Sequence, residues 1–222
     1  MKIKFLLLFM LLTIHNATYS LSDRLAFYWE HLKKPLQVGS ITPSSQKTGE
    51  AIASYLLKHD GSKEILEVGV GPGSGITDFL VANLQQNDKL TFVEINPSFA
   101  AILRDKYGHI PNITIIEGDI LTFNPEKKFD YIISSLPLTT LPKEFIEQYF
   151  EHLESLIRPY GIISYIQYMG VSLRMFLSSL FRSKSLKTKM RIIERFKNKW
   201  LLESTRVFRN MPPTWVHHLQ VA

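Results

Sequence analysis

Four glycines at alternate positions are the feature of this chain with the clearest chemical meaning. They are Gly69, Gly71, Gly73 and Gly75. They follow the largely apolar run 65–68 and precede the largely apolar run 76–80. A strand that ends in glycines and leads into a helix lets backbone N–H groups approach a ligand closely, because no Cβ atom keeps the ligand away. The pattern therefore predicts a loop that binds a nucleotide-type cofactor, with an ordinary tight turn as the alternative.

The spacing of these glycines discriminates among cofactors. The dinucleotide fingerprint is G-x-G-x-x-G, whereas this segment has G-x-G-x-G-x-G, so the third glycine comes one position early for NAD. A Walker phosphate loop would continue with Gly-Lys-Ser or Gly-Lys-Thr, which does not follow here. What remains resembles motif I of the class I S-adenosylmethionine (SAM)-dependent methyltransferases. The residues that carry this resemblance, and that it implies as SAM-binding positions, are Glu67, Gly69, Gly71, Gly73 and Thr77.

Two further acidic residues each close a strand-like run. Glu94 follows the run 89–93, and Asp119 comes shortly after the run 112–116. In an open parallel sheet the ligand lies at the carboxyl ends of the strands, so both carboxylates are expected to point at it. Glu94 can accept hydrogen bonds from both ribose hydroxyls. The methyltransferase pattern places the second carboxylate, Asp119, near the adenine amino group. Each residue could instead be a solvated loop charge, but their order and spacing favour a cofactor site.

The acceptor side is predicted from the segment 129–138, which reads as a buried strand followed by a turn that contains proline. Amino-directed members of the superfamily carry [Asn/Asp/Ser]-x-x-[Tyr/Phe] here, with proline inside, and its acceptors orient the nitrogen that is methylated. By this resemblance the catalytic positions are Ser134, Ser135 and Pro137. Leu138 replaces the aromatic residue, so a nucleobase would lose its stacking partner. A simple turn at the end of a strand is the alternative.

Length and composition fit one such domain. With 222 residues the chain can bury a full core but is short for two domains. The absence of cysteine excludes disulfides, thiolate metal sites and a cysteine nucleophile. The seven histidines show no metal-ligand spacing, and the adjacent His217 and His218 would point to opposite faces of a strand. We therefore expect no metal.

Hydrophobic periodicity and turn residues predict an alternation of strands and helices. The expected helices are 21–34, 44–59, 75–86, 97–107 and 143–157, and the expected strands are 63–68, 89–94, 112–117, 129–134, 161–167, 204–208 and 215–221. Such an order implies right-handed βαβ units. The expected fold is α/β: a Rossmann-like class I methyltransferase with a mainly parallel seven-stranded sheet flanked by helices, N-terminal amphipathic helices and a basic helical insert.

A basic segment spans residues 172–200. It contains nine lysines and arginines against one acid, Glu194, within a chain of net charge +6. Its apolar residues form one helical stripe: Leu186, Met190, Ile193, Phe196 and Trp200. A basic helix with an apolar face suits an anionic membrane surface. The same composition could bind RNA phosphates, or the stripe could pack on the sheet with its cations solvated.

Three segments make the resemblance more specific. The run KPLQVGSITPSS at 34–45, SLPL at 135–138 and NMPPTWV at 210–216 resemble segments of the bacterial phospholipid N-methyltransferases, the soluble type that acts on phosphatidylethanolamine. The resemblance covers about residues 25–220. It implies that the protein uses SAM to methylate the ethanolamine nitrogen at a membrane surface. It also implies that the first helix and the basic segment lie on the bilayer.

The N-terminal segment 1–20 has a different character. Lys2 and Lys4, the apolar run 5–14 and the small polar stretch 17–20 have the form of a secretory signal peptide. The apolar run is too short for an ordinary spanning helix. It is a signal, an interfacial anchor on the cytoplasmic face or a misassigned upstream start, and we favour the last two. We therefore expect a signal-like or anchor segment at 1–20, one methyltransferase domain at 21–222, and a peripheral enzyme on the cytoplasmic face, with secretion as the alternative.

Two rival functions use the same motifs. An adenine N6-methyltransferase acting on ribosomal RNA shares the glycine motif, but Leu138 and the lack of a separate C-terminal helical domain disfavour it. The second rival, from another class, is a non-catalytic membrane-binding protein that kept a SAM-binding fold. The intact glycines together with Glu94 and Asp119 disfavour that interpretation. RNA is thus the less favoured partner.

Overall fold

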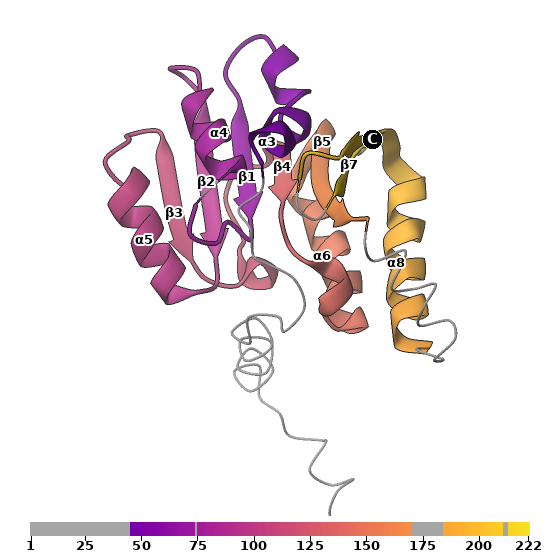
Figure 1. The fold of residues 1–222 in the computed structure, drawn as a ribbon. Coiled ribbons are helices and arrows are strands. Elements are labelled where there is room, and N and C mark those ends of the chain that lie inside the picture. The colour runs from indigo at the N-terminus through magenta and orange to yellow at the C-terminus, as the bar shows by residue number, and fades with distance from the viewer. Residues whose placement is uncertain (1–44, 74, 170–183, 211–212) are drawn as a thin grey trace, which may run out of the picture. The chain divides into compact units, whose positions relative to one another are not determined.

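The computed structural model describes residues 45–73, 75–169, 184–210 and 213–222 (Figure 1). All of them belong to one compact unit that spans Thr42–Ala222. The signal-like segment 1–20, the predicted helix 21–34, the run 34–44 and the first part of the basic segment lie outside the described residues.

One seven-stranded sheet forms the centre of this unit, with the strand order β3-β2-β1-β4-β5-β7-β6 (Figure 1). The neighbouring pairs from β3 to β5 are parallel, and β7 is antiparallel to both β5 and β6. The strands are β1 (Glu64–Val68), β2 (Lys89–Glu94), β3 (Ile113–Glu117), β4 (Phe129–Ser134), β5 (Ile157–Tyr168), β6 (Leu201–Val207) and β7 (Thr214–Gln220). The Rossmann-like fold predicted from the sequence is confirmed.

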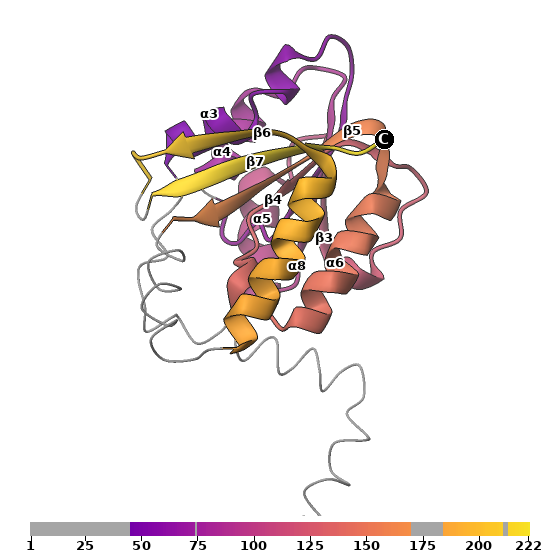
Figure 2. The ribbon, with the colours of Figure 1, turned by 90° about the vertical axis from the view of Figure 1, so that its right-hand side faces the viewer.

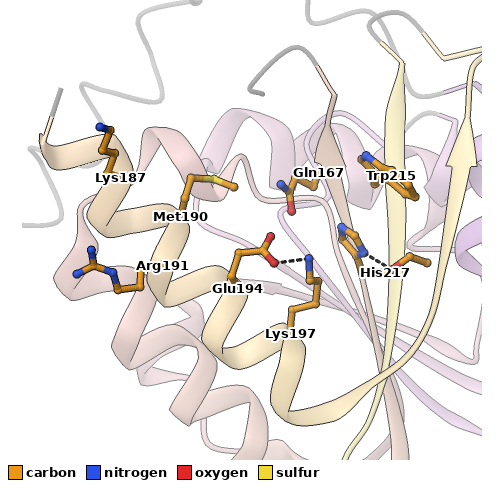
Figure 3. A pocket seen from close by; sticks show the side chains of 9 residues that line it. Gln167, Lys187, Met190, Arg191, Glu194, Lys197, Trp215 and His217 are labelled. Atoms are coloured by element: carbon orange, nitrogen blue, oxygen red, sulfur yellow. Dashed lines mark hydrogen bonds and ion pairs between the residues drawn. The ribbon is translucent and has the colours of Figure 1, made fainter. Parts of the chain in front are cut away.

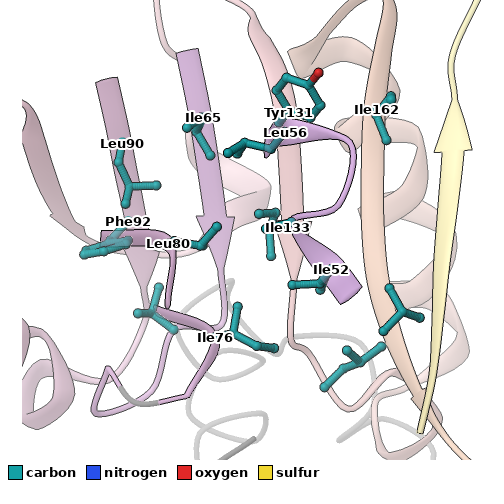
Figure 4. Close-up of a cluster of buried hydrophobic side chains, with 14 of the residues drawn as sticks. Ile52, Leu56, Ile65, Ile76, Leu80, Leu90, Phe92, Tyr131, Ile133 and Ile162 are labelled. Atoms are coloured by element: carbon teal, nitrogen blue, oxygen red, sulfur yellow. The ribbon is translucent and has the colours of Figure 1, made fainter. Parts of the chain in front are cut away.

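Helices cover both faces of the sheet. The α-helices are α3 (Gln46–Ile52), α4 (Ile76–Ala82), α5 (Pro97–Tyr107), α6 (Lys143–Leu156) and α8 (Lys184–Trp200), and the 3-10 turns are η1 (Leu56–Lys58), η2 (Ile120–Thr122) and η3 (Leu138–Thr140). Ile52 of α3 and Leu80 of α4 belong to the same buried cluster as Ile65 and Ile133 of the sheet (Figure 4). Leu103 of α5 belongs to this cluster too. Helices α6 and α8 lie side by side on the opposite face (Figure 2).

Two predicted helices are shorter than expected. The helix expected at 44–59 ends at Ile52 and is followed by the separate 3-10 turn η1. The helix expected at 75–86 spans Ile76–Ala82, because Gly75 has φ +62° and cannot be helical. At its other end the Asn83 side chain donates to the carbonyl of Phe79 at 2.8 Å, which satisfies an end carbonyl and stops the helix.

The fifth strand is longer than expected and begins at Ile157, directly after α6. The two histidines of β7 do point to opposite faces. His217 Nδ1 lies 2.7 Å from Ser204 Oγ on β6, whereas His218 Nε2 lies 3.4 Å from Ser54 Oγ beside α3. The sequence prediction of this alternation is confirmed.

Helix α8 carries the second half of the basic segment. The middle of its apolar stripe is buried within the protein, and Leu186 and Trp200 at the two ends are half-buried. Met190, Ile193 and Phe196 are all buried, and Phe196 stacks on Phe150 of α6 with ring centroids 4.0 Å apart. The middle of the stripe therefore packs on α6 and the sheet and cannot insert into a bilayer, which corrects that part of the membrane interpretation. Among the described helices, none is long and apolar enough to cross a membrane.

Candidate active site

The glycine loop joins β1 to α4 at the carboxyl edge of the sheet. All four of its glycines have positive φ: Gly69 (+72°), Gly71 (+63°), Gly73 (+67°) and Gly75 (+62°). A side chain in this region would strain the backbone, so the conformation itself requires glycine.

The space around each glycine distinguishes packing from ligand access. A Cβ on Gly69 would lie 2.6 Å from Leu136 Cδ2, and one on Gly73 would lie 2.6 Å from Leu103 Cδ2. These two glycines allow close packing of the loop. A Cβ on Gly71 would meet no described atom within 4 Å. Gly71 is therefore the point at which the loop borders open space and a ligand can approach.

Glu94 ends β2 and connects it to the glycine loop. Its side chain is 5% exposed, Oε2 accepts the Gly71 N–H at 2.8 Å, and Oε1 accepts the Asn96 N–H at 2.8 Å. Burial raises the pKa of this carboxyl, and the backbone N–H bonds oppose that shift. Each oxygen has a second lone pair for a further donor, so the predicted contact with ribose hydroxyls is compatible with this geometry.

Glu67 lies within β1 and is 1% exposed. Its Oε1 accepts a hydrogen bond from Thr77 Oγ1 at 2.9 Å, and Oε2 has no partner among the described residues. Burial raises the pKa of Glu67 to about 8. Thr77 thus positions Glu67 through its hydroxyl. An unpartnered buried carboxylate oxygen is costly, and a donor group on a ligand could pair with it.

Asp119 follows β3 and begins the turn η2. Its Oδ1 accepts the Leu121 N–H at 3.0 Å, and burial raises the pKa of Asp119 while this backbone hydrogen bond opposes the shift. The neighbouring Gly118 donates its N–H to the carbonyl of Glu94 at 3.0 Å. This bond links the loops after β2 and β3, so the two predicted carboxylates stand on adjacent loops of the same edge.

The two serines of the acceptor segment have different environments. Ser134 ends β4 with no exposed surface, and its Oγ accepts a hydrogen bond from Tyr149 of α6 at 2.7 Å. Ser135 is partly exposed, and its N–H donates to the carbonyl of Val68 at 3.1 Å. Ser134 therefore belongs to the core of the α6 face and has no surface through which to reach an amine. The amine-orienting role stays a prediction for Ser135.

Pro137 shapes the turn that follows. Its φ of −77° and ψ of 69°, with the Leu138 N–H donating to the Leu136 carbonyl at 2.9 Å, define an inverse γ-turn. The same turn places Leu136 against Gly69. The acceptor segment and the glycine loop are therefore in direct contact, as a methyl transfer between their ligands would require.

Replacement of each serine should separate these roles. Ser134→Ala leaves the Tyr149 hydroxyl buried without its acceptor, so we expect it to lower the free energy of unfolding by about 1 kcal/mol. Ser135→Ala should leave stability within about 0.5 kcal/mol and reduce methyl transfer. Denaturant unfolding and single-turnover methyl transfer would measure the two effects. A stable Ser134→Ala enzyme with little activity would contradict the assignment.

Asp119 can be tested by the adenine group that it is predicted to contact. We expect Asp119→Ala to weaken binding of S-adenosylhomocysteine (SAH) about tenfold, because a charge-assisted hydrogen bond is lost. The control ligand is S-inosylhomocysteine, which lacks the adenine amino group. The wild-type protein should prefer SAH, and the variant should bind both alike in calorimetry. An unchanged preference would exclude Asp119 as the adenine ligand.

These residues fit SAM by two independent features of the structure. The buried Glu67 Oε2 has no hydrogen-bond donor among the described residues, and the loop borders open space at Gly71, next to the carboxylate of Glu94. When bound, SAM supplies a sulfonium-activated methyl group. Among the described His, Asp and Glu residues, no group of three or more is placed to hold a metal ion.

Comparison with known proteins agrees with this fold and loop. The family described as Methyltransferase domain matches residues 65–161. The chain has the class I fold and is a SAM-dependent methyltransferase, with SAM as its cofactor. Ornithine lipid N-methyltransferase of Singulisphaera acidiphila is 23% identical over 201 residues, which are 87% of this chain and 93% of that protein.

Two further similarities have narrower scope. Ribosomal RNA small subunit methyltransferase A of Borreliella afzelii is 35% identical over 94 residues, but these cover only 40% of this chain and 32% of that protein. The crystal structure of N-methyltransferase NodS from Bradyrhizobium japonicum WM9 with S-adenosyl-l-homocysteine has a TM-score of 0.60 at 15% identity, covering 79% of this chain and 86% of that one. This structural likeness supports the fold.

Proposed function

We propose that the enzyme transfers methyl groups from SAM to the amine nitrogen of a membrane lipid headgroup, with phosphatidylethanolamine as the first candidate acceptor. The observation that carries the proposal is the similarity to an ornithine lipid N-methyltransferase over 87% of the chain. That similarity extends well beyond residues 65–161, the part matched by the general methyltransferase family. The family match alone already contains both the glycine loop and the acceptor segment 129–138.

The acceptor segment supports an aliphatic amine. SAM already carries an activated methyl group, so the protein has to align the nitrogen, exclude water and accept the ammonium proton. Leu138 is buried and aliphatic where an adenine-directed enzyme would present an aromatic ring. A small headgroup amine needs no such stacking surface. Ser135 and the carbonyls of the γ-turn are the groups that would orient this amine.

The location at a membrane is part of the proposal. Among the side chains of α8 that the structure describes, four cations are exposed: Lys187, Arg191, Arg195 and Lys199. Because the middle of the apolar stripe of α8 is buried, attraction to anionic lipids would be electrostatic, at about 1 kcal/mol per basic residue. SAM is made in the cytoplasm, so the enzyme would act at the cytoplasmic face as a peripheral protein. Residues 1–20 would assist as an interfacial anchor.

The decisive experiment is transfer of labelled methyl from SAM by the purified full-length protein. Three acceptors are offered in parallel: phosphatidylethanolamine vesicles, ornithine lipid vesicles and ribosomal RNA. Label in phosphatidylethanolamine would support the proposal and give the number of methyl additions. Label in ornithine lipid alone would support a membrane lipid as the acceptor but would replace phosphatidylethanolamine by ornithine lipid as the substrate. Label in RNA alone would overturn the proposal.

Charge reversal should test the membrane role of α8. We expect Arg191→Glu with Arg195→Glu to weaken binding to phosphatidylglycerol vesicles at least tenfold, because two favourable charges become repulsive. The matched control is Lys127→Glu with Lys128→Glu, which changes the net charge equally in an exposed loop before β4. Vesicle sedimentation measures binding, and SAM affinity should not change in either variant. If both pairs of substitutions weakened vesicle binding equally, the effect would come from net charge, and α8 would have no special role in membrane binding.

A further inference from the structure

A groove of about 690 Å³ lies between α8 and the face of the sheet formed by β5, β6 and β7 (Figure 3). This volume is within the range of sites that bind small molecules. Met190 on α8 and Trp215 on β7 provide apolar surface, and Lys187, Arg191 and Lys197 provide positive charge. Glu194 is the one carboxylate among the described lining residues, and it pairs with Lys197. The groove thus combines an apolar surface with two cations, Lys187 and Arg191, that form no ion pair with any residue in the described part of the chain.

Buried polar atoms without partners gather beside this groove. Three of them are Tyr165 OH, Gln167 Oε1 and His217 Nε2, and none has a hydrogen-bond partner within the described part of the chain. Such atoms are rare in folded proteins, and each calls for an explanation. The fourth described atom of this kind is Glu67 Oε2 in the cofactor site. The four atoms therefore lie in two places, the SAM site and the surroundings of this groove.

His217 is kept neutral in this position. Its Nδ1 lies 2.7 Å from Ser204 Oγ, and burial lowers its pKa to about 4, reinforced by the charges of Lys197 and His218. A neutral imidazole whose Nδ1 donates to Ser204 presents Nε2 as an acceptor, and the other tautomer presents it as a donor. Either form can bind a polar ligand group without adding charge.

The register of the sheet shows that this groove lies next to the acceptor segment after β4. Val68, Ser134, Tyr165 and His217 form one row across β1, β4, β5 and β7. Val68 and Ser134 are the last residues of their strands, before the glycine loop and the acceptor segment. Gln167 lies two residues beyond this row on β5, and it also lines the narrow space under Pro137 and Leu138. Gln167 is thus shared by the groove and the acceptor segment.

Helix α8 itself is tied to the same edge. Lys189 Nζ donates to the carbonyl of Thr139, within η3, at 3.4 Å. The end of α8 that carries Lys187 and Arg191 therefore lies next to the turn where the amine is expected. An amphiphile that carries an amine and an anionic group could place the first at the turn and the second at these cations.

We propose that the groove between α8 and β5–β7 is the acceptor site for such an amphiphile, an inference that rests on the proposed function. The anionic oxygens of its headgroup bind Lys187 and Arg191 at the mouth. The adjoining polar atoms pair with Gln167 and His217, and its nonpolar part lies over Met190 and Trp215. The site thereby selects acceptors in which an amine and an anion are close together.

Calorimetry with soluble lipid tests this site apart from membrane binding. The probe is monomeric dihexanoyl phosphatidylethanolamine, added to the full-length protein saturated with SAH. We expect Arg191→Gln and Gln167→Leu each to weaken its binding about tenfold. The matched control is Arg195→Gln, the same change one turn further along α8 at an exposed residue outside the described groove lining. A second probe, a short-chain ornithine lipid, distinguishes a phosphate from a carboxylate as the preferred anion.

The outcomes separate this inference from the proposed function. If both groove variants bound the lipid with wild-type affinity, or if Arg195→Gln weakened binding equally, the groove would not be the acceptor site. The proposed methyl transfer to a lipid would be unaffected by that result. Absence of methyl transfer to any aminolipid would overturn both. Because Arg191 is exposed, its replacement should leave the fold intact, and unchanged SAH affinity would verify this for each variant.

Discussion

Gly71→Arg should lower the affinity for SAM by at least about a hundredfold and abolish methyl transfer, while the protein remains folded. Gly71 borders open space next to Glu94, whose carboxylate accepts the Gly71 N–H at 2.8 Å. An arginine side chain there would fill the space in which the cofactor is expected and place a cation beside that carboxylate. Calorimetric titration with SAM, together with thermal denaturation, measures both parts of the prediction.

Gly61→Arg is the matched control for this variant. Gly61 also has positive φ (+94°), and a Cβ there would likewise meet no described atom within 4 Å. Both substitutions therefore carry a similar backbone cost of about 1–2 kcal/mol. Gly61 precedes β1 at the amino edge of the sheet, opposite the glycine loop. Near-normal SAM binding by Gly71→Arg, or equal loss in both variants, would exclude the loop as the cofactor site.

The sequence predicted the architecture because its signals are local. Strand and helix periods, Asn96 and Pro97 at a helix start, and the glycines after β1 each act within a few residues of the chain. The rule that ligands bind at the carboxyl ends of parallel strands then brought Glu94 and Asp119 to the glycine loop. The direct bond from Gly71 to Glu94 bears out that placement of the two segments.

The remaining features depend on partners distant in sequence. The register of β4 decides that Ser134, and not Ser135, faces α6. The hydrogen bond to Ser134 Oγ then depends on the position of Tyr149 on that helix. The buried middle of the α8 stripe required the aromatic surface of α6, including Phe150. The groove residues come from β5 and β7, which are paired although far apart in the chain. The sequence analysis predicted the alternation of His217 and His218, but it used this pattern only to argue against a metal site.

Glu67→Gln should weaken SAM binding and remove its dependence on pH. The pKa of Glu67 is raised to about 8 by burial, so the free enzyme holds this carboxyl largely protonated at neutral pH. The ammonium group of SAM would favour the carboxylate form, so binding should release a proton below pH 8. Wild-type affinity is therefore expected to rise from pH 6 to pH 8. The amide cannot ionise, and its affinity should stay low throughout.

The same substitution should affect the free protein in the opposite direction. The folded pKa of Glu67 lies above the ordinary value of 4.5, so the folded state binds more protons than the unfolded state between pH 4.5 and about 8. Stability without SAM should fall across that window in the wild-type protein, because the carboxyl ionises in the unfolded state while burial keeps it protonated in the folded state. Glu67→Gln keeps a neutral group there and should melt at a higher temperature than the wild type at pH 9.

The control for both effects is Glu117→Gln, at the end of β3. Glu117 pairs with Arg104 at 2.9 Å in a partly exposed position, so its replacement should leave the pH profile of SAM binding unchanged. Calorimetry at pH 6, 7, 8 and 9 and thermal denaturation at the same values measure the two profiles. If Glu67→Gln bound SAM with the wild-type pH profile, the cofactor would not contact this carboxyl. A gain in stability coupled to a loss of binding would show that the unpartnered oxygen of Glu67 is kept for the ligand at a cost to the fold.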